Sequence, residues 1–346
     1  MAYTTINKHT DYFNTKLYTG NGSTQNITGV GFQPDFIWQK ERNGTSYFVI
    51  TDSVRGNTKQ LFPNVAAAEA TDSNYITSFD SDGFGQGQNN DTNENSKNYV
   101  AWNWKAGTTG SGTTGGSGTN KSYSYSVNTT AGFSIIKYEG NGTAGHTIPH
   151  HLGVAPKLVI AKNRDASSNS WAVYSETNGN GLFFLDATDA GAVYSSIYNN
   201  TAPTSSVVTL GNGGNANANT QNIVLYCFAE KTGYSKFGKY IGNGSTNGTF
   251  AYTGFKPSVV FIKDISAVRN WVQYDNKRDT YNYVRNALTS NDASAVEFDN
   301  SNYNRIDFLS NGFKMRGGSS GVGNDTNASG GTYVYMAFGQ SLPKFD

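Results

Sequence analysis

The 346-residue sequence predicts an all-β fold of three tandem β-sandwich units, jelly-roll or lectin-like, with short helical turns. Two features of the chain lead to this prediction. A motif of nearly constant spacing occurs three times, and the composition combines 22 tyrosines, 20 phenylalanines and 40 glycines with only 7 prolines. Repetition indicates one structural unit used several times. Aromatic residues among glycine and small polar residues are typical of short strands joined by tight turns.

Each copy of the motif begins with a Gly-Asn-Gly triplet, and a proline follows 14 to 16 residues later. An apolar run then ends on a lysine six residues after the proline. The triplets begin at Gly20, Gly140 and Gly242, the prolines are Pro34, Pro156 and Pro257, and the lysines are Lys40, Lys162 and Lys263. Because the spacing is kept while the residues between differ, we predict that the three lysine-ending runs are equivalent strands. Tandem copies suit the presentation of a surface better than the construction of one catalytic pocket.

An Asp-x-x-Arg pattern links the first copy to the third. Asp52 and Arg55 in the first copy correspond to Asp275 and Arg278 in the third, and the middle copy lacks the pattern. Such a pair could act as an acid and an electrophile. Because active sites are seldom duplicated in register, a structural ion pair or a clamp on a turn is the preferred interpretation.

An Asn-Asp-Thr-Asn run also occurs in the first and third copies, at 90–93 and 324–327, and is missing from the middle copy. These runs are rich enough in oxygen to suggest a calcium loop, but the glycine and the terminal glutamate of an EF-hand are not at their places. Side-chain caps of a β-turn explain the runs at least as well. The sequence leaves open whether they bind a cation.

Strands are predicted where apolar and aromatic residues run together, as in strands covered on both faces. The predicted strands are 35–40, 47–51, 99–104, 157–162, 171–174, 223–228, 259–263 and 333–338. Helical patterns are scarce, and the candidates are the alanine-rich segment 64–70 and, more weakly, 279–288. Core packing is the preferred interpretation of the tryptophans, with sugar stacking as the alternative for the repeated pair Trp171 and Trp271.

Composition also predicts the domain organisation. The first unit covers 1–106, a linker and lead-in rich in Gly, Ser and Thr covers 107–131, the second unit covers 132–233 and the third covers 234–346. Residues 107–120 contain no side chain that would anchor a core, so we expect a flexible linker that lets the first unit move. The second and third units are joined directly and are expected to pack as one rigid body.

Charge and cysteine content argue against several classes of protein. A net charge of +1 with 15% charged residues provides no basic surface for nucleic acid. No apolar run is long enough to insert into a membrane, and the N-terminus lacks the apolar core of a secretory signal. The single cysteine, Cys227, lies in an apolar run and is expected to be a small buried residue. No cofactor is expected, because no phosphate loop, nucleophile elbow or other catalytic set is present.

The candidate site residues are few. A histidine cluster is formed by His146, His150 and His151, and an i, i+4 pair would bind zinc if it stood on a helix. Pro149 and the neighbouring glycines argue against a helix there, so an exposed turn without metal is predicted. Four tyrosines among polar neighbours, namely Tyr123, Tyr125, Tyr281 and Tyr283, are weak candidates for binding a ligand at the surface.

Seven segments carry a resemblance to a known family: 1–6, 17–22, 29–40, 99–107, 132–135, 226–238 and 308–314. In these segments the chain resembles a family of uncharacterised virion-associated repeat proteins of marine tailed phages, notably those of cyanobacteria. The resemblance covers nearly the whole chain, and it departs from the family at 145–153, where relatives usually carry a plainer turn. It implies a virion appendage or surface protein and supplies no catalytic residues.

These observations together predict a phage structural protein located in the virion and not an enzyme. The preferred role is a tail-fibre or appendage component that contacts the host surface by binding a receptor or glycan. The alternative is a capsid-decorating or tail-scaffold protein without host binding, and a polysaccharide-degrading enzyme is a more distant third. The expected partners are other virion proteins and possible host-surface glycan, with a homotrimer as the favoured assembly.

Overall fold

The computed structural model describes the chain except for residues 1–3, 180, 293–297, 300–304, 318–324 and 341–346. Strands dominate the described part and pair antiparallel. Its helical elements, three or four residues long, are η1 (His9–Asp11), α1 (Asn90–Asn93), η2 (Glu176–Asn178), α2 (Ser195–Tyr198) and α3 (Gly214–Asn217). The all-β sandwich class predicted from the sequence is confirmed. None of the described helices has the length and apolar character needed to cross a bilayer.

One strand order occurs three times in the larger sheets. In the first repeat the order is β1 (Phe13–Thr19), β9 (Asn98–Trp104), β3 (Phe36–Glu41) and β4 (Val49–Asp52). In the second it is β13 (Phe133–Glu139), β20 (Asn222–Phe228), β15 (Leu158–Asn163) and β16 (Ala172–Ser175). In the third it is β21 (Ser235–Ile241), β29 (Thr332–Gln340), β23 (Lys256–Asp264) and β24 (Trp271–Asp275). The runs that end at Lys40, Lys162 and Lys263 therefore occupy the same place in each sheet, next to the closing strand.

A three-stranded sheet accompanies each larger sheet. These small sheets are β2 (Gln25–Thr28), β8 (Gly83–Gln86) and β7 (Ile76–Asp80); β11 (Gly115–Gly116), β14 (His146–Pro149) and β19 (Val207–Leu210); and β22 (Phe250–Tyr252), β28 (Gly312–Met315) and β27 (Ile306–Leu309). Each pair of sheets encloses a core of its own. In β3, for example, Ile37 points to the small sheet and packs with Phe84. This is two-layer packing of antiparallel sheets, in which one face of each larger sheet packs on its small sheet.

Further strands extend the larger sheets at their edges. Before β13 the second sheet continues through β12 (Ser122–Asn128) and β10 (Thr108–Thr113), and beyond β16 through β17 (Gly181–Phe184) and β18 (Ala192–Val193). The third continues through β25 (Asn286–Thr289) and β26 (Phe298–Asp299), and the first repeat contains the short pair β5 (Lys59–Gln60) and β6 (Ala70–Thr71).

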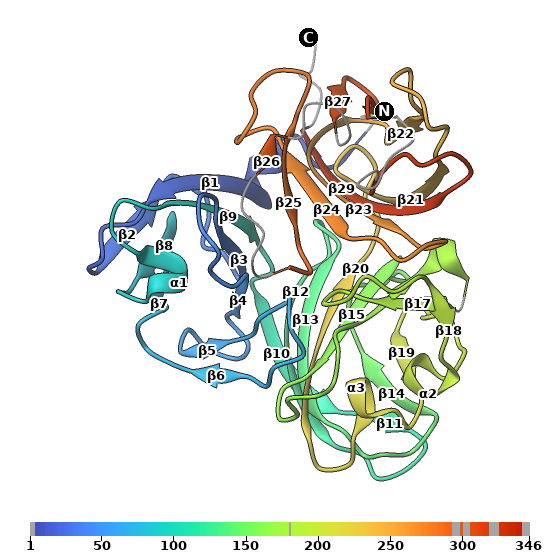
Figure 1. Ribbon diagram of the computed structural model, residues 1–346. Helices are drawn as coiled ribbons and strands as arrows, with labels where there is room; N and C mark the ends of the chain where they lie inside the picture. Colours follow the sequence, from blue (N-terminus) through green and yellow to red (C-terminus); the bar gives the residue numbers. More distant parts are fainter. Residues whose placement is uncertain (1–3, 180, 293–297, 300–304, 318–324, 341–346) are drawn as a thin grey trace.

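The opposite faces of the three larger sheets meet in one shared core. Side chains alternate along each strand, so in β3 Trp38 points to this central core while Ile37 points away from it. Trp38 packs against Phe261 of the third repeat at 5.1 Å between ring centroids, and Phe36 packs against Tyr226 of the second at 4.8 Å. Figure 1 shows the three repeats as lobes around this centre, blue, green and orange in turn. The buried tryptophans, Trp38, Trp102, Trp104, Trp171 and Trp271, all belong to it, which confirms the core interpretation.

The segment predicted to be a flexible linker is instead part of a sheet. Residues Thr108–Thr113 form β10 and pair with β12 along their whole length. Gly110 and Gly112 lie under the rings of Tyr125 and Tyr123, where an added Cβ would come within 2.5 and 2.6 Å of the two hydroxyls. Glycine is needed here for the aromatic cover and not for flexibility. The shared core likewise contradicts the expected free motion of the first unit, whereas the unit boundaries at 106, 131 and 233 stay predictions.

Neither predicted helix forms. In 64–70 the polar groups are bonded to other segments: the carbonyl oxygen of Ala66 accepts a hydrogen bond from Lys162 Nζ at 2.7 Å, and the backbone N–H of Glu69 donates to the Arg164 carbonyl at 2.7 Å. The last residues of 279–288 belong to β25, and the Asp279 carboxylate accepts the backbone N–H of Asn286 at 2.6 Å. In 64–70 contacts with distant residues override the local helix propensity, and in 279–288 the side-chain cap and the pairing of β25 do so.

Candidate functional site

The histidine cluster does not form one site. His146 is buried, with Nδ1 at 2.9 Å from Asn217 Oδ1 and Nε2 at 2.7 Å from Thr114 Oγ1, so both ring nitrogens are engaged. His150 is also buried, and its Nε2 lies 3.1 Å from the Thr204 carbonyl oxygen. The exposed turn predicted here is therefore wrong for these two residues. Among the described residues, no three or more His, Cys, Asp or Glu side chains are grouped as metal ligands.

His151 comes together with the first pair of candidate tyrosines. Its ring stacks on Tyr125 at 3.8 Å between centroids, and its Nε2 lies 2.9 Å from the Tyr123 hydroxyl. Tyr123 is 8% exposed and belongs to the core of the second repeat, so its predicted surface position is wrong. Tyr125 is half-buried. Only the edge of this aromatic group reaches the surface.

The opposite face of β12 lines a polar groove, which we call the β12 groove. Since side chains alternate, Ser122 and Ser124 point away from the core that holds Tyr123. One part of the groove is a cavity of about 660 Å³ between β12 and the first repeat, lined by Phe32, Asp35 and Lys105 among others. The other part, about 790 Å³, runs along β13 and includes Lys137. Both cavities are lined by Ser124, so they meet at this residue.

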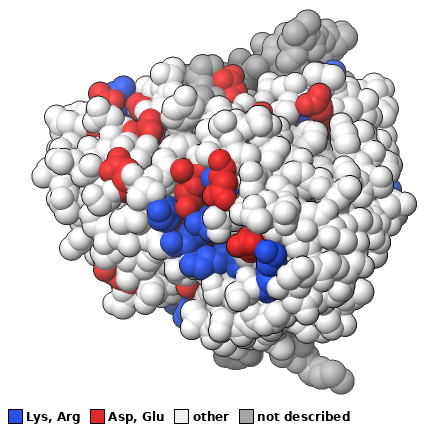
Figure 2. All heavy atoms as spheres, turned by 90° about the horizontal axis from the view of Figure 1, so that it is seen from below, with Lys and Arg blue, Asp and Glu red and all other residues white. Residues whose placement is uncertain are grey.

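Hydroxyls, amides and cations dominate the second cavity. It is lined by Asn120, Lys121, Ser122, Lys137, Glu139, Arg164 and Asn222 together with neighbouring residues of β12 and β13. Lys121 forms an ion pair with Glu139 at 2.5 Å, whereas Lys137 forms none among the described side chains. The face of the molecule seen from below carries a band of Lys and Arg side chains bordered by Asp and Glu (Figure 2). Such a surface offers many hydrogen bonds to a hydroxyl-rich ligand and few apolar contacts.

Each cavity of the groove has one carboxylate among its described lining residues. Asp35 lines the first cavity and Glu139 the second. Asp35 accepts hydrogen bonds from the Ser53 hydroxyl at 2.7 Å and the Ala106 N–H at 2.9 Å, and burial raises its pKa. These contacts hold β10 against the first repeat, which is a structural task. Hydrolysis of a glycosidic bond needs two carboxyl groups flanking the same bond.

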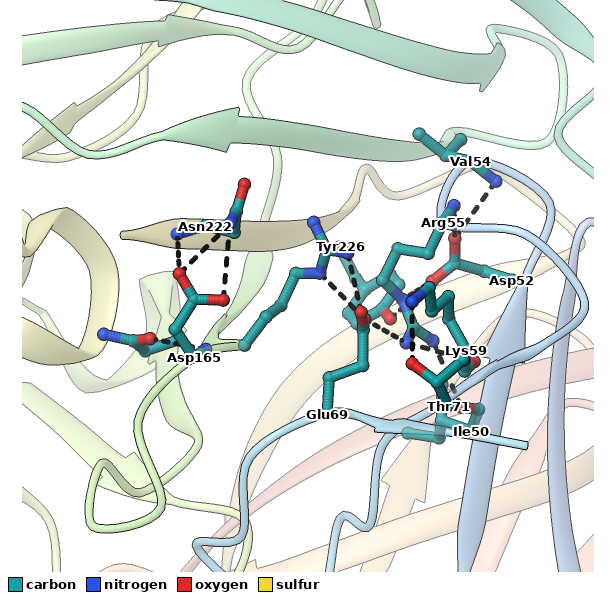
Figure 3. Close-up of polar contacts among 12 residues, drawn as sticks. Ile50, Asp52, Val54, Arg55, Lys59, Glu69, Thr71, Asp165, Asn222 and Tyr226 are labelled. Carbon is teal, nitrogen blue, oxygen red and sulfur yellow. Dashed lines mark hydrogen bonds and ion pairs between the residues drawn. The ribbon is translucent and has the colours of Figure 1, made fainter. Parts of the chain in front are cut away.

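The Asp-x-x-Arg pairs are buried junctions between repeats. Arg55 Nε lies 2.5 Å from Asp52 Oδ2, with both side chains inaccessible to solvent, and the Tyr226 hydroxyl of the second repeat donates to the same carboxylate at 2.7 Å. Figure 3 shows Tyr226 and Arg55 converging on this region. In the third repeat, Asp275 receives the Trp102 indole N–H of the first repeat at 3.2 Å. The structural interpretation of these pairs is therefore the one that the geometry favours.

Glu69 connects the first two repeats at the edge of the same network. Its carboxylate accepts hydrogen bonds from Arg55 Nη1 at 2.9 Å and from Arg164 at 2.8 Å and 2.7 Å. Burial opposes the charge of Glu69, but the hydrogen bonds and charges of the two arginines outweigh it and lower the pKa. Since Arg164 also lines the β12 groove, this network fixes one wall of the groove.

The repeated lysines hold loops, and two of the three hold a loop of a neighbouring repeat. Lys162 Nζ donates to the Ala66 carbonyl of the first repeat at 2.7 Å, and Lys263 Nζ donates to the Thr188 carbonyl of the second at 3.1 Å. Lys40 Nζ donates within its own repeat, to the carbonyl of Ser46 at 2.7 Å. Burial lowers the pKa of all three lysines to about 8. Their constant place in the motif reflects this packing task.

The first Asn-Asp-Thr-Asn run caps a turn, and the second begins at Asn324, which lies outside the described residues. Asn93 ends α1, its Oδ1 accepts the Asn21 N–H at 3.0 Å and its Nδ2 donates to the carbonyls of Gly87 and Ser23, both at 2.6 Å. The amide thus occupies the centre of the loop, where a cation would need those carbonyl oxygens. Asn217 does the same in the second repeat, with the Asn141 N–H at 3.0 Å. The middle copy has therefore kept the capping asparagine, Asn217, although the rest of the Asn-Asp-Thr-Asn motif has changed.

The second pair of candidate tyrosines lies in the third repeat, away from the β12 groove. Tyr281 is 84% exposed and Tyr283 is 50% exposed. Both line a cavity of about 480 Å³ together with Arg305. The predicted surface position of these two residues is confirmed, and their binding of a ligand stays a prediction.

Comparison with protein families matches residues 8–341 to a domain of unknown function, DUF7483. The chain belongs to the DUF7483 family. A search among curated proteins found no match. Because the matched region of this DUF7483 chain extends from just before η1 to just past the end of β29, all three repeats and the β12 groove lie within it.

Sequence reasoning missed most of the groove of this DUF7483 protein. Lys105, Lys137 and Arg164 are far apart in the chain and meet only because β10 and β12 extend the second sheet toward the first repeat. The one local indication is the alternation of serine and tyrosine through 122–125, which predicts a strand with one polar face. Strand β10, which pairs with β12, was missed because its residues were predicted to be a linker.

Proposed function

We propose that this chain is a structural protein of a phage virion, displayed on the particle as a tail-fibre or appendage component, and that it contacts the host by binding saccharide in the β12 groove. The observation that carries the binding proposal is the groove itself, an open channel lined by hydroxyls, amides and ammonium groups with Phe32 and Tyr125 at one end. The assignment to a virion rests on the resemblance of the sequence to phage proteins. The role is adhesion without catalysis, which agrees with the single carboxylate in each cavity.

The groove proposal is tested with Ser124→Trp, which places a bulky ring where the two cavities meet. Purified protein is applied to an array of neutral and acidic saccharides and to cells of a marine cyanobacterium. We expect the wild type to bind and Ser124→Trp to lose at least tenfold in affinity. Ser168→Trp, in an exposed loop of the second repeat, is the matched control and should bind as the wild type does. Equal binding by Ser124→Trp would contradict a role for the groove.

The absence of catalysis has its own test. The same protein is incubated with cyanobacterial envelope polysaccharide, and reducing sugar is measured over time. No release is expected. Steady release by the wild type would overturn the adhesion proposal in favour of a polysaccharide-degrading enzyme.

One observation favours the alternative, a capsid-decorating or tail-scaffold protein. At the outer edge of the third repeat, Ile241, Phe250 and Tyr252 are 54%, 43% and 59% exposed. Exposed apolar residues grouped on an edge suit contact with another protein. Binding to virions stripped of their appendages, without binding to cells, would support this role. The homotrimer favoured by the sequence stays a proposal, which sedimentation would test as a mass three times the 37.3 kDa of the chain.

A further inference from the structure

The third repeat contains a second concave site that the groove does not explain. The segment between β24 and β25 surrounds a cavity of about 480 Å³ lined by Arg278, Tyr281, Tyr283, Arg285 and Arg305. The β12 groove runs along the second repeat and its junction with the first, and the two sites share none of their lining residues. We call this cavity the arginine–tyrosine pocket.

Guanidinium groups gather around one tyrosine ring in this pocket. Arg305 Cζ lies 5.5 Å from the centroid of Tyr283 and Arg316 Cζ lies 6.0 Å from it. Arg316 is paired with Asp307 at 2.5 Å. Arg305 makes no ion pair within the described part of the chain, and its buried Nε has no hydrogen-bond acceptor there. Arg305 also lines the pocket, so an anion bound there would give its guanidinium a charge partner.

Aspartates accompany the arginines of the pocket. Asp275 is paired with Arg278 at 2.5 Å. Asp279 is the carboxylate among the described lining residues, and it accepts the backbone N–H groups of Arg285 and Asn286 at 2.7 and 2.6 Å.

The exposed rings indicate what kind of anion fits. Tyr281 and Tyr283 are 84% and 50% exposed, so their faces are open to a flat or ring-shaped ligand. Arginine binds carboxylate and sulfate groups through paired N–H donors, and tyrosine supplies a rigid amphipathic surface. We propose that the arginine–tyrosine pocket binds an acidic saccharide, with Arg305 on the carboxylate or sulfate group and the tyrosine rings against the sugar. The pocket binds independently of the β12 groove.

The test measures binding of trigalacturonic acid, of a sulfated dextran and of neutral maltotriose to the full chain by calorimetry. We expect one or both acidic probes to bind, more weakly as salt rises, and maltotriose to show no binding at this pocket. Carboxylated and sulfated probes distinguish the two sources of the acidic group. Arg305→Gln should weaken acidic binding at least tenfold, and Tyr281→Ala, which alters a ring that is 84% exposed, should weaken it severalfold without changing the thermal midpoint.

Lys239→Gln is the matched control, because it removes one exposed positive charge from β21 of the same repeat outside the pocket. It should bind like the wild type, and so should Ser124→Trp in the groove. The proposal fails if neither acidic probe binds, if both pocket variants bind as the wild type does, or if Lys239→Gln loses as much as Arg305→Gln. Loss of acidic binding in Ser124→Trp alone would move the acidic saccharide to the groove, so the two proposals fail separately.

Discussion

Tyr226 and Trp102 occupy matched places in the closing strands of the second and first repeats, and each donates to an aspartate of another repeat. The third closing strand carries Met336 at this place, which is buried in the same core and can make no such bond. The second repeat correspondingly has Ser175 where the others have an aspartate. The middle copy thus lacks Asp-x-x-Arg because the third closing strand has no donor that could bind an aspartate there.

We expect Tyr226→Phe to lower the free energy of unfolding by about 1.5–3 kcal/mol, as for a hydrogen bond to a charged group. The Asp52 carboxylate keeps Arg55, so the fold should survive. The measurement is urea denaturation at pH 7. Tyr234→Phe is the control, because Tyr234 is equally buried and its hydroxyl has no hydrogen-bond partner within the described residues. Equal effects of the two substitutions would rule out a special role for the bond between repeats.

Trp271 contributes packing as well as a hydrogen bond. Its ring lies 5.3 Å from that of Phe183 of the second repeat, and its Nε1 donates to the Phe184 carbonyl at 2.8 Å. Trp271→Ala should cost on the order of 3–5 kcal/mol, as large-to-small core substitutions do. Trp271→Phe should cost less, because much of the ring remains. An unchanged thermal midpoint in Trp271→Ala together with lost binding to cells would identify a binding platform instead.

His9 makes stability depend on pH. Burial, aided by the charge of Lys277, lowers the pKa of His9 from 6.5 to about 4. Between pH 6.5 and 4 the unfolded chain takes up a proton that the folded chain refuses, so this contribution is complete above pH 6.5 and is lost as the pH falls toward 4. His9→Asn lacks this contribution. From pH 7 to pH 4.5 the thermal midpoint of the wild type should therefore fall more than that of His9→Asn. An equal fall in both proteins would contradict the assignment.

At the scale of elements, strands were predictable where burial on both faces demands apolar residues. The predicted 35–40 and 157–162 differ by one residue from β3 and β15, because such apolar runs are stable where both faces of the strand are covered. Elements set by distant partners were not predictable. The strand β10 contains no apolar residue, since the rings of Tyr123 and Tyr125 cover its glycines. The same limit applies to the β12 groove and the arginine–tyrosine pocket, whose walls come from separate segments.

The capping asparagines give a prediction about single turns. Asn217 is fully buried, its Oδ1 accepts the Asn141 N–H at 3.0 Å and its Nδ2 donates to the Gly211 carbonyl at 2.7 Å. Asn217→Ala leaves these backbone groups without partners and should cost roughly 2–4 kcal/mol. Asn217→Asp keeps the acceptor and loses the donor, so an intermediate loss is expected. Asn219→Ala, at an exposed position of the same loop, is the control. The measurement is chemical denaturation of the three variants. Equal denaturation midpoints for all three would contradict the capping role.

At the scale of the molecule, the central core decides how the chain unfolds. Phe13 of the first repeat stacks on Phe338 of the third at 5.4 Å, and Phe228 of the second lies 5.9 Å from the same ring. Separating any one repeat would expose these aromatic faces, which together form one cluster. Apolar area removed from water is worth about 25 cal/mol per Å². The repeats therefore stabilise one another, unlike independent domains that are joined only by a linker.

We accordingly expect the full chain to unfold in one cooperative transition, with calorimetric and van't Hoff enthalpies that agree. A fragment of residues 1–106 should be unfolded or aggregated on its own, because Trp38 and Phe36 would lose their partners in the other repeats. Scanning calorimetry of the chain and circular dichroism of the fragment are the measurements. Resolved transitions together with a folded fragment would show that each sandwich is stable alone and that the shared core is only a docking surface. A single transition would mean that a change at one junction, such as Tyr226→Phe, lowers the stability of the whole molecule. The groove and the pocket would then lose stability together with it.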